Sequence, residues 1–494
     1  MKYILVIDQG TSSTRAHLVD SKGVLIFTEQ KALKIISSQS GFVEQDPDEI
    51  WSSVLHCVAK AIAFANNSGF KIVSCAITNQ RETSVVWHRK TQKPVYNAIS
   101  WQDSRTAEIC SKVSEDDISY IRSSTGLVLS PYFSASKIKW IFDNVLNGKA
   151  YEDYACGTID SFLLFKLTNG LVHKTDSTNA SRTLLYNIKS LSYDKRLLDI
   201  FGISHSILPE VCPTISDFGV VDKSFFDVEI PIDVMIGDQQ SAAVGHKCFD
   251  RKSAKATFGT GCFLMMNIGE NFQLFDESLL TTILYNINGN PTYALEGSIF
   301  YAGSALNWVK DNLELFSDFD EAEKLINSVG DNDGVFCVPA LSGLGAPYWQ
   351  SCARAVFVGM TNSTTKAHLV RSVYESIVYQ LNDLFRVIKQ GDADIKSLSV
   401  DGGVVNSSWF NQFLSDILDI DILKSDNCEL TSVGAAYLAG IKLGFYESFS
   451  DVKQLKQGSS FFQAKDISPA QRESLLRGWS LAIESSINYS VDKL

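Results

Sequence analysis

The sequence lacks an excess of basic residues. Its 494 residues include 56 acidic and 44 basic side chains, which gives a net charge of −12. Binding to nucleic-acid phosphates needs clustered lysine and arginine, and no such run is present. We therefore expect no nucleic acid among the partners of this protein.

Two further features are absent. The ten cysteines include no C-x-x-C pair, which argues against both a zinc site and a disulfide framework. The apolar segment before Asp8 is too short for a secretory signal, and no run approaches the ~18 apolar residues of a membrane span. We expect a cytoplasmic protein with reduced thiols and no membrane insertion.

The length of the chain exceeds what one ordinary hydrophobic core contains, so two domains are expected. Hydrophobic residues make up 45% of the sequence, which is enough to bury both.

A short stretch near the middle of the chain has the pattern of a strand that ends at a polar site. A mostly apolar run, residues 232–236, leads into Gly237, and Asp238 and Gln239 follow before a run of small residues that opens a helix. In α/β proteins a carboxylate at a strand end faces a crevice. The alternative is that Asp238 only caps the helix.

Two hairpins with polar, glycine-containing tips lie about half a chain apart. Strands are expected at residues 3–7, 15–19 and 24–28, and the first tip, residues 8–15, offers hydroxyl and amide donors suited to phosphate oxygens. The second tip is Gly259-Thr260-Gly261. Each could be an ordinary polar turn. Together they suggest duplicated lobes, each closing one side of a nucleotide's phosphates.

A polar cluster, residues 79–83, follows the strand expected at residues 72–78. A regular strand would send Arg81 and Glu82 to opposite faces, so the backbone must bend if both touch one small ligand. The alternative is a solvated charged turn. Trp101 is either core or the wall of a ligand site.

Two glycine-containing segments near the carboxyl end have different expected roles. Gly402 and Gly403 lie between a strand and a helix, which suits a purine or ribose lying against the backbone. Residues 434–440 form a helix with a face of small residues, which lets another element pack close.

These motifs, in this order, resemble the FGGY carbohydrate kinases of the actin, Hsp70 and hexokinase superfamily, and within them the members that phosphorylate glycerol. The resemblance covers residues 3 to about 450, and the absence of a G-x-x-x-x-G-K-[ST] motif agrees with it, because this superfamily holds phosphate without one. It implies an α/β fold of two actin-like (ribonuclease H-like) lobes, with mixed sheets flanked by helices and the active-site cleft between them. The expected domains are residues 1–247, which bind glycerol, and 248–494, which bind the nucleotide. The motifs that carry the resemblance are residues 8–15, 41–47, 77–83, 175–183, 237–240, 259–263, 339–349 and 401–403.

The resemblance also implies roles for individual residues. Asp238 would be the general base, Asp8 and Asp238 would hold Mg²⁺, and the protein would form a homodimer or tetramer. Glycerol would be bound by Arg81, Glu82, Trp101, Tyr132, Asp238, Gln239 and Phe263. ATP would be bound by Thr11, Ser12, Ser13, Arg15, Thr260, Gly261, Gly303, Asn307, Gly403 and Ser407.

The sequence departs from the family pattern at three positions. Asn307 stands where glutamine is usual and Ser407 where asparagine is usual, which bears on nucleotide affinity and base preference. Glu229 falls at the arginine with which some bacterial members bind fructose 1,6-bisphosphate, and an acid there would repel a phosphate. We expect no inhibition by that sugar phosphate.

Two alternatives remain. Another FGGY kinase would act on a pentulose or related polyol, although Trp101 and the adjacent Arg81 and Glu82 would fill the space that a larger sugar needs. A nucleotide-driven switch of the Hsp70 type would need a partner-binding module after the second lobe, and the chain is expected to leave no room for one.

Overall fold

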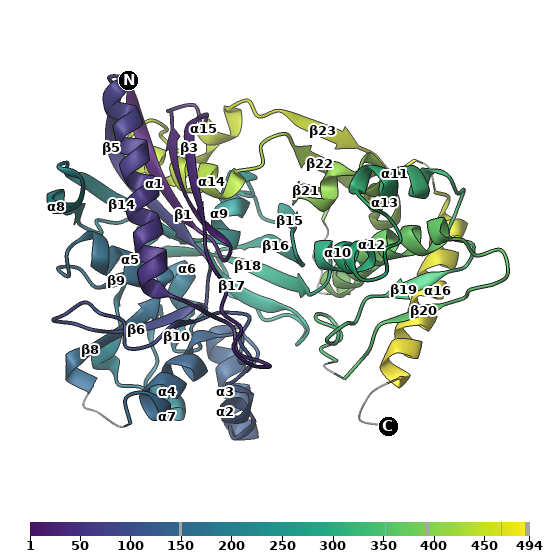
Figure 1. The fold of residues 1–494 in the computed structure, drawn as a ribbon, viewed down its shortest axis with the longest axis horizontal. Coiled ribbons are helices and arrows are strands. Elements are labelled where there is room, and N and C mark those ends of the chain that lie inside the picture. Colours follow the sequence, from purple (N-terminus) through teal and green to yellow (C-terminus); the bar gives the residue numbers. More distant parts are fainter. Residues whose placement is uncertain (148–150, 351, 391–394, 466, 490–494) are drawn as a thin grey trace.

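The structure is a computed structural model that describes residues 1–147, 151–350, 352–390, 395–465 and 467–489. Two mixed sheets form its centre (Figure 1). The strands of the first sheet, in spatial order, are β13 (Val220–Val221), β14 (Ile230–Gly237), β5 (Lys71–Asn79), β1 (Lys2–Gln9), β2 (Ser13–Val19) and β3 (Leu25–Ala32). Those of the second are β17 (Leu280–Ile287), β18 (Asn290–Ile299), β16 (Cys262–Gly269), β15 (Ala254–Phe258), β21 (Ser397–Gly402), β22 (Asp421–Ser425) and β23 (Ser459–Phe462).

The two sheets repeat one topology. In each, an antiparallel hairpin (β1–β2 or β15–β16) pairs on one side with a third antiparallel strand, β3 or β18. On the other side, the first strand of the hairpin pairs with a parallel strand, β5 or β21. That strand pairs in turn with a second parallel strand, β14 or β22. The expected fold of two actin-like lobes with mixed sheets is confirmed.

Helices cover both faces of the first sheet. One face is covered by α1 (Pro47–Asn67), which starts with Pro47 at its first turn and with the Asp46 carboxylate accepting from the Asp48 amide. Its apolar side packs on β1, β2 and β3, with α5 (Ile159–Leu167) beside it. The opposite face is covered by α9 (Asp238–Gly245) and α14 (Leu430–Lys442).

The helix α14 crosses from the second half of the chain to the first lobe. It lies on β1, β5 and β14 and packs closely on α9, where a Cβ at Gly434 would be 1.9 Å from the carbonyl oxygen of Ser241. Only glycine allows that approach, so the predicted close packing by a small-residue face is confirmed. The helix α14 is therefore part of the core of the first lobe, although it comes from the second half of the chain.

The second sheet is covered mainly by helices of the second half of the chain (Figure 1). Among them the long α12 is the most deeply enclosed, because all of its residues from 372 to 385 are buried. These helices are α10 (Gly303–Asp311), α11 (Phe319–Asn327), α12 (Lys366–Gln390), α13 (Ser408–Leu418) and α16 (Pro469–Asn488); α15 (Phe449–Gln454) packs with the apolar core around α14, and β19 (Phe336–Val338) pairs with β20 (Val356–Val358).

A subdomain of the first lobe is formed mainly by the chain between β5 and β14, and the short strand β4, which precedes α1, joins its largest sheet. Its largest sheet has the order β4-β7-β6-β8. The strands here are β4 (Glu44–Gln45), β6 (Ser84–His88), β7 (Ala98–Ile99), β8 (Tyr154–Thr158), β9 (Lys174–Asp176), β10 (Tyr186–Asn187), β11 (Ser192–Tyr193) and β12 (Glu210–Cys212). The helices are α2 (Ala107–Ser111), α3 (Glu115–Thr125), α4 (Ser134–Asn144), α6 (Ser177–Ala180), α7 (Lys195–Phe201) and α8 (Lys223–Phe226).

The sequence predicted neither disulfides nor a membrane-spanning helix. Eight of the ten cysteines are buried, and no disulfide joins cysteines within the described ranges. In the same ranges no helix has both the length and the apolar character needed to cross a membrane.

Candidate active site

A cavity of about 160 Å³ lies between the two lobes. The first lobe contributes the tip of β1–β2, the end of β5 and the start of α9, and the second lobe contributes the β15–β16 hairpin. All seven residues expected to bind glycerol line this cavity. Its lining is Thr11, Arg81, Glu82, Trp101, Tyr132, Asp238, Gln239, Thr260, Gly261 and Phe263.

The backbone bends at Glu82, as the sequence predicted for a pair that shares one ligand. Glu82 has a φ of 61°, in the left-handed region. Arg81 and Glu82 are only 3% and 1% exposed, which excludes a solvated charged turn. A Cβ at position 237 would lie 2.8 Å from Cδ of Arg81, so Gly237 gives the arginine its space.

A network of buried ion pairs holds Arg81 and Glu82. Arg81 Nη1 lies 2.6 Å from Glu296 Oε2, and Arg182 bridges Glu296 Oε1 at 2.8 Å and Glu82 Oε1 at 2.6 Å. Burial alone would raise the pKa of Glu296, but Arg182 and Arg81 lower it to about 2. Because Glu296 lies on β18, the network joins the second sheet to the first lobe.

Sequence reasoning missed Arg182 and Glu296 as site residues. The signal for Glu296 was a single carboxylate in the apolar strand β18, since an ionised group buried in a sheet requires a partner. Lys255 on β15 gives the same signal. Its buried ammonium donates to Gln239 Oε1 at 2.5 Å and to Thr257 Oγ1 at 3.0 Å.

Aromatic side chains form one wall of the cavity. The ring of Trp101 lies 5.6 Å from that of Tyr132 and 6.2 Å from that of Phe263, between centroids. Trp101 Nε1 donates to Thr11 Oγ1 at 2.9 Å. Trp101 is thus a wall of the cavity, half-exposed, rather than a core residue.

The loop that carries Tyr132 is stabilised by hydrogen bonds from a buried lysine. Lys137 Nζ donates to the carbonyl oxygens of Tyr132 and Phe133 at 2.5 and 3.1 Å. Burial lowers the pKa of Lys137 to about 7. Both contacts use the ammonium as donor, so Lys137 fixes the position of the Tyr132 backbone.

Asp238 lies at the point where β14 ends and α9 begins. Gly237, not Asp238, is the N-cap residue, and Asp238 Oδ1 accepts from the Gln239 amide at 2.7 Å. Its side chain is 29% exposed toward the cavity, and Arg81 Nε lies 3.4 Å from Oδ1. Burial raises the pKa of Asp238 to about 6, although Arg81 opposes the shift. Such a carboxylate is largely ionised at neutral pH and can accept a proton.

A second cavity, of about 600 Å³, lies in the second lobe and meets the first at Thr260. It contains the four residues expected to bind the nucleoside, namely Gly303, Asn307, Gly403 and Ser407. The Ser407 hydroxyl also caps α13 by accepting from the Phe410 amide at 3.0 Å. Sequence reasoning had not assigned the other lining residues, which include Leu306, Phe319, Asp320, Glu323 and Tyr374.

The structure does not bring every expected phosphate-binding side chain into these cavities. The Ser13 hydroxyl is buried and accepts from Gln30 Nε2 at 2.9 Å, so in this structure it contacts β3 and lines neither cavity. Ser12 is exposed at the hairpin tip and lines neither cavity. Arg15 Nη1 lies 3.2 Å from Glu429 Oε2 and 3.6 Å from Asp8 Oδ2.

Asp8 lies close to this site and is almost completely buried. Burial raises the pKa of Asp8 to about 7, Arg15 opposes the shift, and the negative charges of Glu429 and Asp238 add to it. Hard carboxylate oxygens that repel one another are the type of group that Mg²⁺ binds. The donor set of Asp8 and Asp238 therefore fits the expected metal.

Comparison with known proteins matches both halves of the chain. The N-terminal domain of the FGGY family of carbohydrate kinases matches residues 3–245, and the C-terminal domain of that family matches residues 254–443. The glycerol kinase of Halothermothrix orenii is 44% identical over 495 residues, covering 99% of this chain and 99% of the relative. Glycerol kinase 2 of Thermotoga maritima is also 44% identical, over 494 residues and 99% of both chains.

Solved structures show the same architecture. The structure of Plasmodium falciparum glycerol kinase with ADP is similar with a TM-score of 0.92 and 37% identity over 98% of both chains. A xylulose kinase of Lactobacillus acidophilus shares the fold, with a TM-score of 0.87 and 21% identity over 98% of this chain and 97% of that one. From the two matched domains, the full-length relatives and the repeated lobes, the chain belongs to the FGGY family of carbohydrate kinases.

Proposed function

We propose that this chain transfers the terminal phosphoryl group of ATP to glycerol and forms sn-glycerol 3-phosphate, in glycerol catabolism. The observation that carries the proposal is the compact cavity between the lobes, in which fixed charges and aromatic rings face one another. Relatives named glycerol kinase that are 44% identical over the whole chain support it.

The cavity suits a small uncharged triol. Arg81 donates to hydroxyl oxygens, while the carboxylates of Glu82 and Asp238 accept from hydroxyl groups. The rings of Trp101 and Phe263 supply apolar surface for the C–H edges of the carbon chain. The ion pairs with Arg182 and Glu296 fix these charges before the substrate arrives, which reduces the cost of ordering them on binding.

Asp238 acts as the general base in this proposal. A carboxylate is too weak to ionise an alcohol in advance, so Asp238 takes the hydroxyl proton as the new P–O bond forms, while the electrons of the breaking P–O bond go to ADP. An effect of ~10²–10⁴-fold is typical of such catalysis. Most of the acceleration must therefore come from positioning and from charge stabilisation.

The remaining roles follow from the two cavities. Asp8 and Asp238 would hold Mg²⁺, which supplies positive charge to the phosphates when bound. Thr260 lines both cavities, which supports a position for the terminal phosphate of ATP between them. The backbone at Gly303 and Gly403 borders the cavity for the nucleoside.

The test is ADP release by the purified protein with Mg-ATP. Glycerol is compared at equal concentration with no acceptor, xylulose, ribulose, erythritol and dihydroxyacetone. We expect release that depends strongly on glycerol. Activity only with a pentulose would keep the phosphoryl-transfer machinery but overturn the assignment of the substrate cavity.

We further propose that the protein acts in the cytoplasm as a homodimer or tetramer. The support is the family resemblance. Sedimentation equilibrium tests the assembly state, and a single monomeric species would contradict it.

A further inference from the structure

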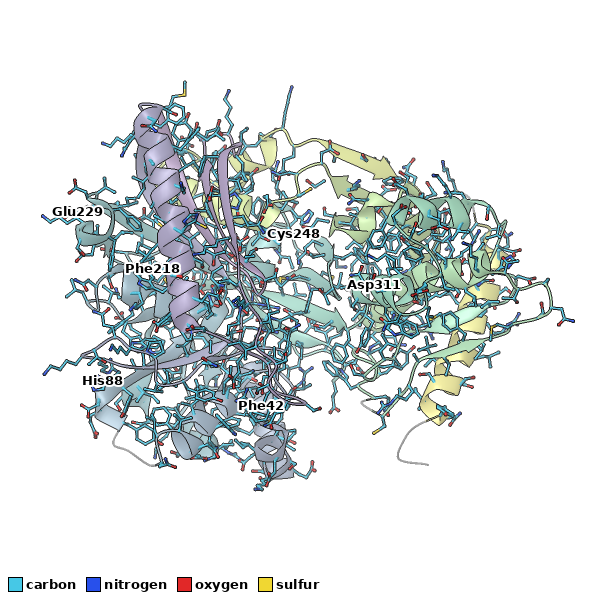
Figure 2. All side chains as sticks on the ribbon, viewed as in Figure 1. Phe42, His88, Phe218, Glu229, Cys248 and Asp311 are labelled. Atoms are coloured by element: carbon cyan, nitrogen blue, oxygen red, sulfur yellow. The ribbon has the colours of Figure 1, made fainter. Side chains whose placement is uncertain are left out.

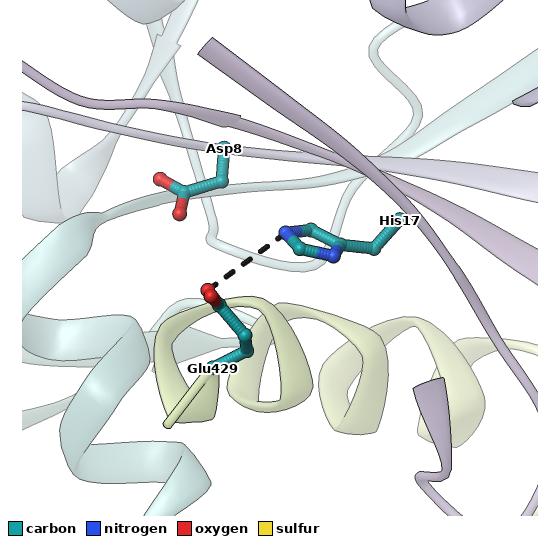
Figure 3. A group of neighbouring side chains, drawn as sticks. All are labelled: Asp8, His17 and Glu429. Atoms are coloured by element: carbon teal, nitrogen blue, oxygen red, sulfur yellow. Dashed lines mark ion pairs between the residues drawn. The ribbon is translucent and has the colours of Figure 1, made fainter. Parts of the chain in front are cut away.

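Three side chains that commonly bind metals converge beside the first hairpin. Asp8 comes from β1, His17 from β2, and Glu429 immediately precedes α14 (Figure 3). One ligand atom from each lies within 4.8 Å of the others. Ligands around one divalent cation, at ~2.1 Å from it, are separated by roughly 3–4.2 Å, so a small adjustment closes the three around an ion.

The imidazole of His17 has a nitrogen that no other described group satisfies. The side chain is completely buried, and Nδ1 lies 2.9 Å from Thr28 Oγ1. Nε2 has no hydrogen-bond partner within the described ranges and points at Glu429, 4.0 Å from Oε2 (Figure 3). A neutral imidazole with a free nitrogen lone pair is the form in which histidine binds a metal.

The hydrogen bond at Nδ1 is the type that orients a metal-binding histidine. When Nδ1–H donates to the Thr28 hydroxyl, the lone pair of Nε2 faces the cluster. That lone pair then faces the oxygens of a carboxylate, which is unfavourable unless a cation lies between them.

The charge balance of the cluster also favours a cation. Arg15 supplies one positive charge to two carboxylates, at 3.6 Å from Asp8 and 3.2 Å from Glu429. Its side chain is 32% exposed, whereas that of Asp8 is 9% exposed. Arg15 can therefore withdraw toward solvent and give up its place to a divalent ion, which compensates both carboxylates.

We propose that Asp8, His17 and Glu429 form a binding site for a borderline transition-metal ion such as Mn²⁺, Co²⁺ or Zn²⁺, in preference to Mg²⁺. An imidazole nitrogen is a good ligand for these ions, while Mg²⁺ prefers a shell of oxygens alone. The site shares Asp8 with the proposed kinase reaction, but its occupancy requires neither ATP nor glycerol.

The experiment is pulsed electron paramagnetic resonance of the full-length protein with one equivalent of Mn²⁺ and without nucleotide or glycerol. We expect ¹⁴N modulation from one imidazole, retained when Mg²⁺ is added in about tenfold excess. H17V should remove the modulation and weaken Mn²⁺ binding by about tenfold or more, measured by titration calorimetry. Mg²⁺ binding should stay unchanged.

The matched control is H56A, which removes an exposed histidine paired with Glu29 on the same lobe. It should keep the ¹⁴N signal and the wild-type Mn²⁺ affinity. If H17V does not fold, E429Q serves in its place, and it should weaken Mn²⁺ binding while keeping the imidazole signal in the bound fraction.

A bound Mn²⁺ without nitrogen coordination, or wild-type affinity in H17V, would overturn the proposal. Glycerol-dependent ADP release is measured in parallel with Mg-ATP. Because the spectroscopic readout contains no substrate, failure of the metal site and failure of the proposed reaction are separate results.

Discussion

The two cavities that meet at Thr260 are built in different ways. The smaller one, about 160 Å³, is lined by ionised side chains that buried partners from both lobes hold in place. The larger one, about 600 Å³, is lined by glycine backbone, helix ends and partly apolar side chains of the second lobe. Breaking the buried ion pairs around the smaller cavity should therefore affect activity and stability together, whereas a change in the larger cavity should mainly adjust affinity.

This difference changes what is expected of Arg81. In a solvated turn the arginine could be removed at little cost in stability. The structure buries it against Glu296 and places it near Asp238, so its removal leaves buried carboxylates without a countercharge.

The largest effect on turnover is expected from D238N, which removes the proton acceptor from the smaller cavity. The variant should bind ATP and glycerol but lose about 10²–10⁴-fold in kcat, or roughly 3 to 6 kcal/mol of barrier. Steady-state kinetics with saturating glycerol measure the loss, and calorimetry checks substrate binding. A variant with nearly full rate would show that Asp238 is not the base.

The largest effect on stability is expected from E296Q, which removes the negative charge that pairs with both Arg81 and Arg182. Breaking a buried ion pair costs about 3–5 kcal/mol, because one charge stays buried without a partner. Urea unfolding measures the loss, and the KM for glycerol should rise while that for ATP changes little.

Its matched control is E321Q, which breaks the surface pair with Lys366. Exposed pairs contribute about 0–1 kcal/mol, so this variant should unfold near the wild-type midpoint. An equal loss of unfolding free energy in E296Q and E321Q would show that the buried network stabilises the protein no more than a surface ion pair does.

The pH dependence of the reaction should report Asp238. The ionised form is required, and its pKa is raised to about 6, so kcat should fall about tenfold per pH unit below that value. The free energy of unfolding should depend on pH in the opposite direction to kcat. Because the folded pKa lies above the usual 3.8, the protonated form favours folding, and this contribution is lost as pH rises through about 6.

Both halves of that prediction have a direct measurement. The logarithm of kcat is followed from pH 5 to 8 at saturating substrates, and D238N should be at least as stable as the wild type at pH 7. A flat rate profile across this range would contradict the assignment.

A smaller effect is expected in the larger cavity. N307Q lengthens an exposed amide on α10 by one methylene group and introduces the glutamine that the family resemblance predicts at this position. A gained hydrogen bond is worth about 1 kcal/mol, so the KM for ATP should fall severalfold. The KM for glycerol and the unfolding midpoint should not move, and a change in either would show that the cavities are coupled.

The smallest effect is expected from fructose 1,6-bisphosphate. Glu229 is exposed on the outer side of the first lobe, beside α8 (Figure 2). An acid there repels phosphate, so glycerol-dependent activity should be unchanged by submillimolar sugar phosphate. Inhibition in that range would contradict the prediction.

The sequence by itself determined the local parts of the site. The apolar run into Gly237 predicted a strand end with Asp238 at a crevice, and the polar cluster after β5 predicted the bend at Glu82. These features follow from the preferences of neighbouring residues, so they can be predicted along the chain. The motifs, taken together, also led to the family and its two repeated lobes.

Only the tertiary structure decided the partners that come from distant segments. Arg81 and Glu296 are 215 residues apart, and neither strand pattern contains information about the other. The same holds for the packing of α14 on the first lobe and for the approach of Glu429 to His17. Periodicity shows which side of an element is buried, but folding alone determines which charged groups meet there, because their pairing depends on the register of whole elements.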